Sequence, residues 1–147
     1  MKIETTRFGI IEVADDRVIT FPWGIPGFEN VKRYVLIDHK DTPFRWLQAV
    51  DEPSLAFVVC PPEIIGIQYN IPAEKLEPLE AENQEDAVVM TLISFDREKN
   101  IIRFHIRSPL IFSLSNRKAY QWTMDAGEVK KYVNLPEGME WQDIHVE

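Results

Sequence analysis

The sequence has little of what nucleic-acid binding, cross-linking or membrane insertion requires. Its 147 residues contain 16 Lys and Arg against 24 Asp and Glu, a formal net charge of −8. Phosphate backbones and anionic lipid headgroups bind clustered basic side chains, so we expect no direct contact with nucleic acid or membrane. A single cysteine, Cys60, excludes an internal disulfide and is typical of a reducing compartment. The N-terminus has no apolar signal segment, and no apolar run approaches the ~20 residues that cross a bilayer, so a cytoplasmic protein is predicted.

Motifs for catalysis and metal binding are also missing. There is no nucleophile elbow, phosphate-binding glycine loop, zinc-binding helix motif or EF-hand loop. The three histidines, His39, His105 and His145, are far apart and have no cysteine partner that would suggest a zinc site. Asp15 and Asp16 are adjacent in a predicted turn, where their side chains diverge, whereas general acid–base catalysis needs converging carboxylates. We therefore predict no enzyme activity, no metal and no cofactor.

Short apolar stretches rich in β-branched and aromatic residues alternate with turn residues along the whole chain, which is typical of antiparallel β-structure. Strands are expected at residues 2–6, 9–13, 18–21, 34–38, 44–50, 55–60, 87–95, 101–114 and 118–124, with turns at 14–17, as a hairpin, and at 96–100. Short helices are expected at 71–77 and 126–132. No linker or repeat divides the chain, so the prediction is a single all-β domain over residues 1–147. The strand spacing favours a closed or nearly closed β-barrel.

The strand expected at residues 101–114 has a clear two-residue alternation. Ile102, Phe104 and Ile106 share one face, which we assign to the core. Continued alternation gives an outer face with the candidate partner-binding residues His105, Arg107, Pro109, Ile111 and Ser113. Proline cannot donate to a strand ladder and belongs at an edge, where a partner segment can be added. A bulge at Pro109 would instead reverse the alternation and place Ile111 in the core.

The segment from Phe21 to Glu29 is the most unusual in the chain. Its prolines fix φ and its glycines allow positive φ, so it is predicted to be a rigid loop. Phe21 and Phe28 bracket the loop and are expected to attach it to the end of the barrel. The candidate loop residues are Pro22, Gly24, Pro26, Gly27 and Phe28. A purely structural role and a partner-binding role both fit this pattern.

The order of motifs resembles that of the flagellar assembly factor FliW family. The resemblance rests on Phe21-Pro22-x-Gly24-x-Pro26-Gly27-Phe28-Glu29, then Leu47-Gln48, residues 55–59, Pro61-Pro62, Tyr69 and Pro109-Leu110-Ile111. The family's second signature is similar to Asn-Leu-x-Ala-Pro-Ile-Val-Ile-Asn. In residues 105–113 both asparagines and the alanine of that signature are replaced.

The resemblance implies a flattened antiparallel β-barrel that regulates by binding proteins. It implies two partners, flagellin and the translational repressor CsrA. Accumulated flagellin would occupy the protein and leave CsrA free to repress flagellin mRNA; after flagellin export, the protein would capture CsrA and lift that repression. The alternative is a small-ligand-binding barrel or accessory domain whose mouth is lined by Trp23, Trp46 and Trp122. A packed interior favours the regulator, and an aromatic-lined cavity favours the alternative.

Overall fold

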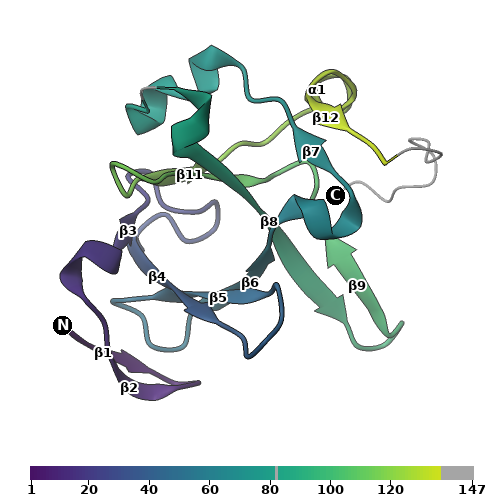
Figure 1. The fold of residues 1–147 in the computed structure, drawn as a ribbon. Helices are drawn as coiled ribbons and strands as arrows, with labels where there is room; N and C mark the ends of the chain where they lie inside the picture. Colours follow the sequence, from purple (N-terminus) through teal and green to yellow (C-terminus); the bar gives the residue numbers. More distant parts are fainter. Residues whose placement is uncertain (82, 137–147) are drawn as a thin grey trace.

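A strongly curved antiparallel sheet forms the body of the molecule in the computed structural model, which describes residues 1–81 and 83–136 (Figure 1). The paired strands follow the order β11-β10-β8-β6-β5-β4-β3, and β9 pairs with β8. Their bounds are β3 Ile19–Thr20, β4 Arg33–Asp38, β5 Arg45–Ala49, β6 Ala56–Cys60, β8 Ala87–Asp96, β9 Ile101–Phe104, β10 Leu110–Ser113 and β11 Ala119–Gln121. The predicted antiparallel β-architecture is thereby confirmed.

The remaining elements are short and lie around this sheet. They are the hairpin β1 Lys2–Thr5 with β2 Gly9–Glu12, the pair β7 Gln68–Tyr69 with β12 Val133–Asn134, the 3-10 turns η1 Asp15–Arg17, η2 Pro62–Ile65, η3 Ala73–Lys75, η4 Glu77–Leu79 and η5 Gln84–Asp86, and helix α1 Ala126–Tyr132. The helix expected at 126–132 is confirmed; a capping box between Asp125 and Glu128 begins it. The helix expected at 71–77 is instead η3, a single 3-10 turn, followed by η4.

The predicted hairpin turn at residues 14–17 is wrong, because η1 joins β2 to β3 and these strands pair with β1 and β4. The terminal strands of the sheet are β3 and β11. Between them, an isolated bridge joins Thr20 of β3 to Lys118, which precedes β11, and the Thr20 N–H donates to the Arg117 carbonyl at 2.9 Å. The closed barrel stays a prediction.

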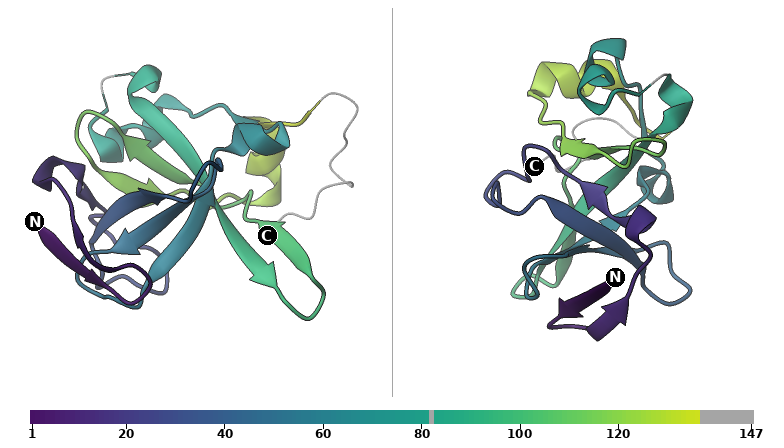
Figure 2. Two further views of the ribbon diagram at one scale, coloured as in Figure 1. Left: turned by 60° about the horizontal axis from the view of Figure 1, so that its bottom comes forward. Right: turned by 90° about the vertical axis from the view of Figure 1, so that its left-hand side faces the viewer.

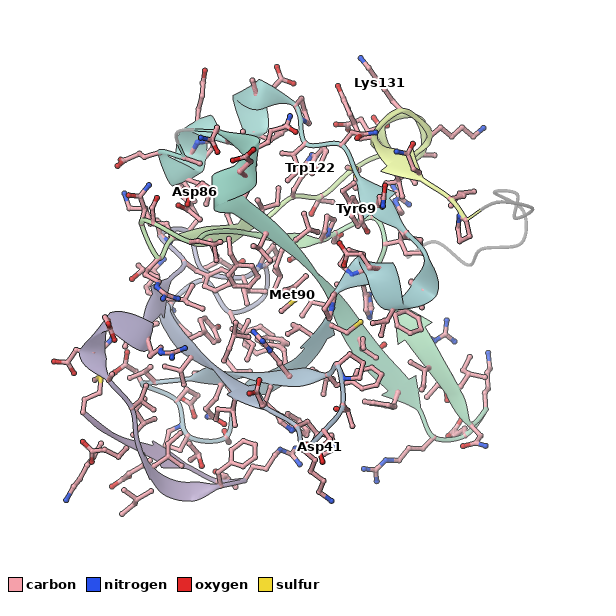
Figure 3. The ribbon with its side chains drawn as sticks, in the orientation of Figure 1. Asp41, Tyr69, Asp86, Met90, Trp122 and Lys131 are labelled. Carbon is pink, nitrogen blue, oxygen red and sulfur yellow. The ribbon has the colours of Figure 1, made fainter. Side chains whose placement is uncertain are left out.

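The concave side of the sheet holds the first core. Phe21, Tyr34 and Leu47 are fully buried there, and the Phe21 ring meets Tyr34 and Phe112 edge to face at 5.1 and 5.9 Å. Met90 reaches into the same space (Figure 3). Large apolar side chains therefore pack on the inside of the curve.

The convex side holds a second core beneath the short helices. Leu79 of η4, Val129 of α1 and Trp122 pack there with Ile111 of β10. Figure 3 shows Trp122 between the sheet and these helices. Since Leu110 and Phe112 belong to the first core, β10 is buried on both faces.

A register shift along β8 explains why the expected strand at 101–114 is wrong. Phe104 pairs with Ile93 and Leu110 pairs with Met90, so five residues, 105–109, span the same length as two residues of β8. The chain therefore has three extra residues here, and because three is an odd number the alternation is reversed, as at a bulge. Phe104 and Ile111 consequently face the same core, and Ile111 is fully buried rather than on the outer face.

Beyond this shift, the hairpin β8–β9 projects away from the sheet (Figure 2). Its register partners Phe95 and Ile102 are 59% and 51% exposed. The assignment of Ile102 to the core is therefore wrong, because the strand continues past the region that the sheet covers. The turn predicted at residues 96–100 is confirmed, since β8 ends at Asp96 and β9 begins at Ile101.

Candidate protein-binding site

The turn loop, residues 21–31, consists of three successive hydrogen-bonded turns. Backbone N–H groups of Gly24, Phe28 and Val31 donate to the carbonyls of Phe21, Ile25 and Phe28 at 2.8, 2.7 and 3.0 Å. Each turn begins where the previous one ends or one residue later, so little of the segment is left without a fixed partner. The predicted loop therefore has a defined turn structure.

The prolines and glycines set the shape of these turns. Gly27 follows Pro26 at the centre of the second turn and has φ +91°, the combination that a type II turn needs. Gly24 has φ +68°, and a Cβ at that position would lie 2.5 Å from the Glu29 Cα. Only glycine at position 24 allows the backbone there to come this close to the backbone of Glu29.

Aromatic contacts attach the turn loop to the sheet at both ends. Phe21 is fully buried against Phe112, and the Phe28 ring lies 5.4 Å from Phe57, edge to face. Phe28 nevertheless stays 42% exposed. It therefore anchors the loop and also presents apolar surface to solvent.

A small hollow lies beside the turn loop, where it meets β11. Trp23, Gly24, Pro26, Glu29, Tyr120 and Gln121 line this aromatic hollow, which has a volume of about 270 Å³. The Trp23 and Tyr120 rings meet edge to face at 6.2 Å, and Trp23 is 57% exposed. The Tyr120 hydroxyl donates to the Lys75 carbonyl at 2.6 Å, which fixes its ring.

The carboxylate of Glu29 is held at the rim of the aromatic hollow. Its Oε1 accepts the Gly27 N–H at 3.1 Å. This bond, with the Glu29 backbone N–H and the charge of Lys32, holds the pKa of the carboxyl below its usual value. The group is therefore anionic at neutral pH, and these two N–H groups leave part of its acceptor capacity unused.

Strand β11 brings the turn loop close to the other predicted segment. That bulge segment, residues 105–109, is fixed by donors from neighbouring strands. Its carbonyls accept hydrogen bonds from the Tyr69 hydroxyl (to Ile106, 2.7 Å), the Gln121 side chain (to Ser108, 3.0 Å) and the Trp122 N–H (to Pro109, 2.9 Å). Gln121 thus lines the aromatic hollow beside the turn loop and also donates to the bulge segment, although its position in the sequence gives no sign of either.

The predicted outer face of residues 105–113 does not form. Pro109, Ile111 and Ser113 are buried, because the shifted register of β10 on β8 places them inside the molecule. His105 and Arg107 are half-buried, and their side chains bond to the Ser94 hydroxyl at 2.9 Å and the Met124 carbonyl at 3.0 Å. A partner role for these five residues stays a prediction without an exposed patch to support it.

The tryptophans expected to line one mouth lie in three separate places. Trp46 contacts Phe8 and lies 4.1 Å from the Arg7 guanidinium, whereas Trp122 is buried in the second core. Only Trp23 reaches the aromatic hollow. The prediction that the three tryptophans line one mouth, on which the ligand-binding alternative depends, is therefore wrong.

Over residues 1–81 and 83–136, no group of three or more His, Cys, Asp or Glu side chains could hold a metal ion. In the same residues, no helix combines the length and apolar character needed to cross a membrane. His145 lies outside the described residues. Protein contact through the turn loop is the use that this surface supports best.

Comparison with known proteins extends the resemblance over most of the chain. The family model described as FliW protein matches residues 2–135. The chain is 34% identical over 130 residues to the flagellar assembly factor FliW of Treponema denticola, covering 87% of this chain and 88% of that protein. It is 35% identical over 130 residues to the protein of the same name from Alkaliphilus metalliredigens, covering 86% and 80%. A crystal structure of the flagellar assembly factor FliW superimposes with a TM-score of 0.77 at 26% identity, covering 86% of this chain and 90% of that one.

Proposed function

Because the chain belongs to the FliW family, we propose that it acts in flagellar assembly by binding two proteins in exchange, the translational repressor CsrA and flagellin. Flagellin that accumulates in the cytoplasm occupies the protein and leaves CsrA free to repress flagellin mRNA. When flagellin is exported, the protein captures CsrA and repression ends. The family match over residues 2–135, which includes the turn loop and β11, carries this proposal.

The exposed apolar side chains of the turn loop support protein binding. Trp23 and Phe28 keep 57% and 42% of their surface exposed on a backbone fixed by turns. Rigid aromatic side chains are the residues that most often anchor protein interfaces. The pair Phe95 and Ile102 on the hairpin β8–β9 offers a second apolar surface; in Figure 1 this hairpin lies at the right of the molecule and β3 at the left.

The charge of the chain supports a basic partner that itself binds RNA. The net charge is −8, and residues 73–86 contain six acidic residues and one lysine. Such a field speeds the encounter with a positively charged protein and opposes contact with RNA. The affinity for CsrA is therefore expected to fall as salt is added.

Titration calorimetry and gel filtration of the full chain with its cognate CsrA, and separately with flagellin, test the proposal. Each pair should release heat and co-elute, and added flagellin should displace CsrA. A gel shift should show that the chain removes CsrA from flagellin leader RNA but does not bind that RNA alone. Absence of heat and of co-elution with both proteins would refute the proposal.

A further inference from the structure

The aromatic hollow contains an indole and a carboxylate that the fold engages only in part. More than half of the Trp23 surface is exposed, and the indole makes its ring contact with Tyr120 alone among the described residues. Glu29 is anionic, and the Gly27 N–H and the charge of Lys32 stabilise its carboxylate, but among residues 1–81 and 83–136 it forms no ion pair. An exposed indole and a carboxylate that can accept further hydrogen bonds line the same hollow.

We propose that the aromatic hollow binds an arginine side chain of a protein partner. The guanidinium lies on the Trp23 indole and donates hydrogen bonds to the Glu29 carboxylate. A planar guanidinium can stack on an aromatic face and pair with a carboxylate at the same time, whereas a lysine ammonium is a single point of charge. This inference rests on the proposed function, because it names the partner chemistry that the turn loop recognises.

The size of the hollow favours one protein side chain over a free small molecule. Its volume of about 270 Å³ lies below the ~300–1,000 Å³ of most small-molecule sites. Because the hollow opens at the surface, a side chain can enter from a docked protein. The net charge of −8 favours a partner with basic side chains.

The hollow is also arranged before any partner arrives. The Gly27 N–H holds the Glu29 carboxylate at 3.1 Å, and the Tyr120 hydroxyl is fixed on the Lys75 carbonyl at 2.6 Å. The turn closed by the Gly24 N–H on the Phe21 carbonyl fixes the backbone of Trp23. Binding therefore has few side chains left to order, which reduces its entropic cost.

The first test uses the full chain alone and does not depend on any partner. N-acetyl-arginine amide is titrated to high millimolar concentration while NMR follows the Trp23 indole N–H and the Gly27 amide. Both signals should shift with saturation, shift less with N-acetyl-lysine amide and stay unchanged with the uncharged N-acetyl-citrulline amide. Unmoved signals, or equal shifts with citrulline, would overturn the inference.

The second test uses whichever of CsrA and flagellin binds the wild type. Trp23→Ala and Glu29→Gln should each weaken binding of at least one partner about tenfold or more, and together by less than the product, because both hold the same side chain. Trp23→Phe should restore part of the affinity. Glu4→Gln makes the same charge change at an exposed position of β1 and should have no effect.

The two tests separate the possible failures. If the wild type binds a partner but Trp23→Ala and Glu29→Gln both bind as the wild type does, the arginine site is wrong and the proposed function stands. If the wild type binds neither partner, the proposed function is wrong and the titration with N-acetyl-arginine amide decides the site by itself. Circular dichroism of each variant confirms that the fold is intact.

Discussion

Replacing Ile111 by alanine tests the register shift on β8. Ile111 is fully buried, pairs with Val89 and Tyr120 across the sheet, and faces the second core. Truncating a buried isoleucine to alanine costs about 2–5 kcal/mol, and the cost rises when the surroundings cannot close the cavity. The strands on both sides of β10 restrict such closure, so we expect about 3–4 kcal/mol, a large part of the ~5–15 kcal/mol that stabilises a typical domain.

Urea unfolding followed by tryptophan fluorescence measures this loss. With a urea m-value of about 2 kcal/mol/M, the midpoint should fall by about 1.5–2 M while the m-value stays the same. Ile102→Ala is the matched control, since the same atoms are removed from a side chain that is 51% exposed. It should change the free energy of unfolding by less than about 0.5 kcal/mol.

Unbroken alternation predicts the reverse order for these two variants. A loss for Ile102→Ala that equals or exceeds that for Ile111→Ala would therefore refute the register shift. Ile111→Asp, which an outer-face position would tolerate, is expected to unfold the protein because it buries a charge.

Three further outcomes are expected. Gly24→Ala should lower the melting temperature more than Gly27→Ala, because both positions have positive φ but only the Cβ at position 24 would lie 2.5 Å from a backbone atom; equal shifts would contradict the close approach. The Ser113 and Ser115 hydroxyls hold the pKa of Asp86 below its ordinary 3.8, so the carboxylate stabilises the fold above that pH and loses this effect as the pH falls through the lowered pKa. The melting-temperature advantage of the wild type over Asp86→Asn should accordingly shrink below pH 3.8, and a constant difference would rule this out. Burial raises the pKa of the Cys60 thiol to about 11, so at pH 8 an aromatic disulfide reagent should modify it far more slowly in the native protein than in urea, and rapid native reaction would argue against burial.

Local signals in the sequence were sufficient for most elements. Helix α1 has the predicted bounds because Asp125 and Glu128, which cap it, lie within one turn of its start. The turn loop was predictable for the same reason, since each proline and glycine acts on its own backbone. β7 and β12 are not predicted, because these two-residue strands pair only with each other and their partners lie far apart in the chain.

Long-range packing determined the features that the sequence does not predict. The alternation predicts a strand correctly only for residues 101–104, and the extra length of residues 105–109 appears only when their partners on β8 are known. Pro109 was the single local sign of it. Similarly, the loop could be predicted but not its neighbour Tyr120, because no local pattern links two residues so far apart in the chain.

The position of β10 between the two cores determines how the molecule can open. β10 contributes buried side chains to both cores, so removing it to expose one core also exposes the other. The two cores therefore unfold as one cooperative unit. In amide hydrogen exchange, the β10 amides are expected to exchange only through global unfolding. The amides near the end of the hairpin β8–β9, where Phe95, Ile101 and Ile102 are exposed, can exchange through local opening. A partner that binds this hairpin could thus slow its exchange while leaving that of β10 unchanged.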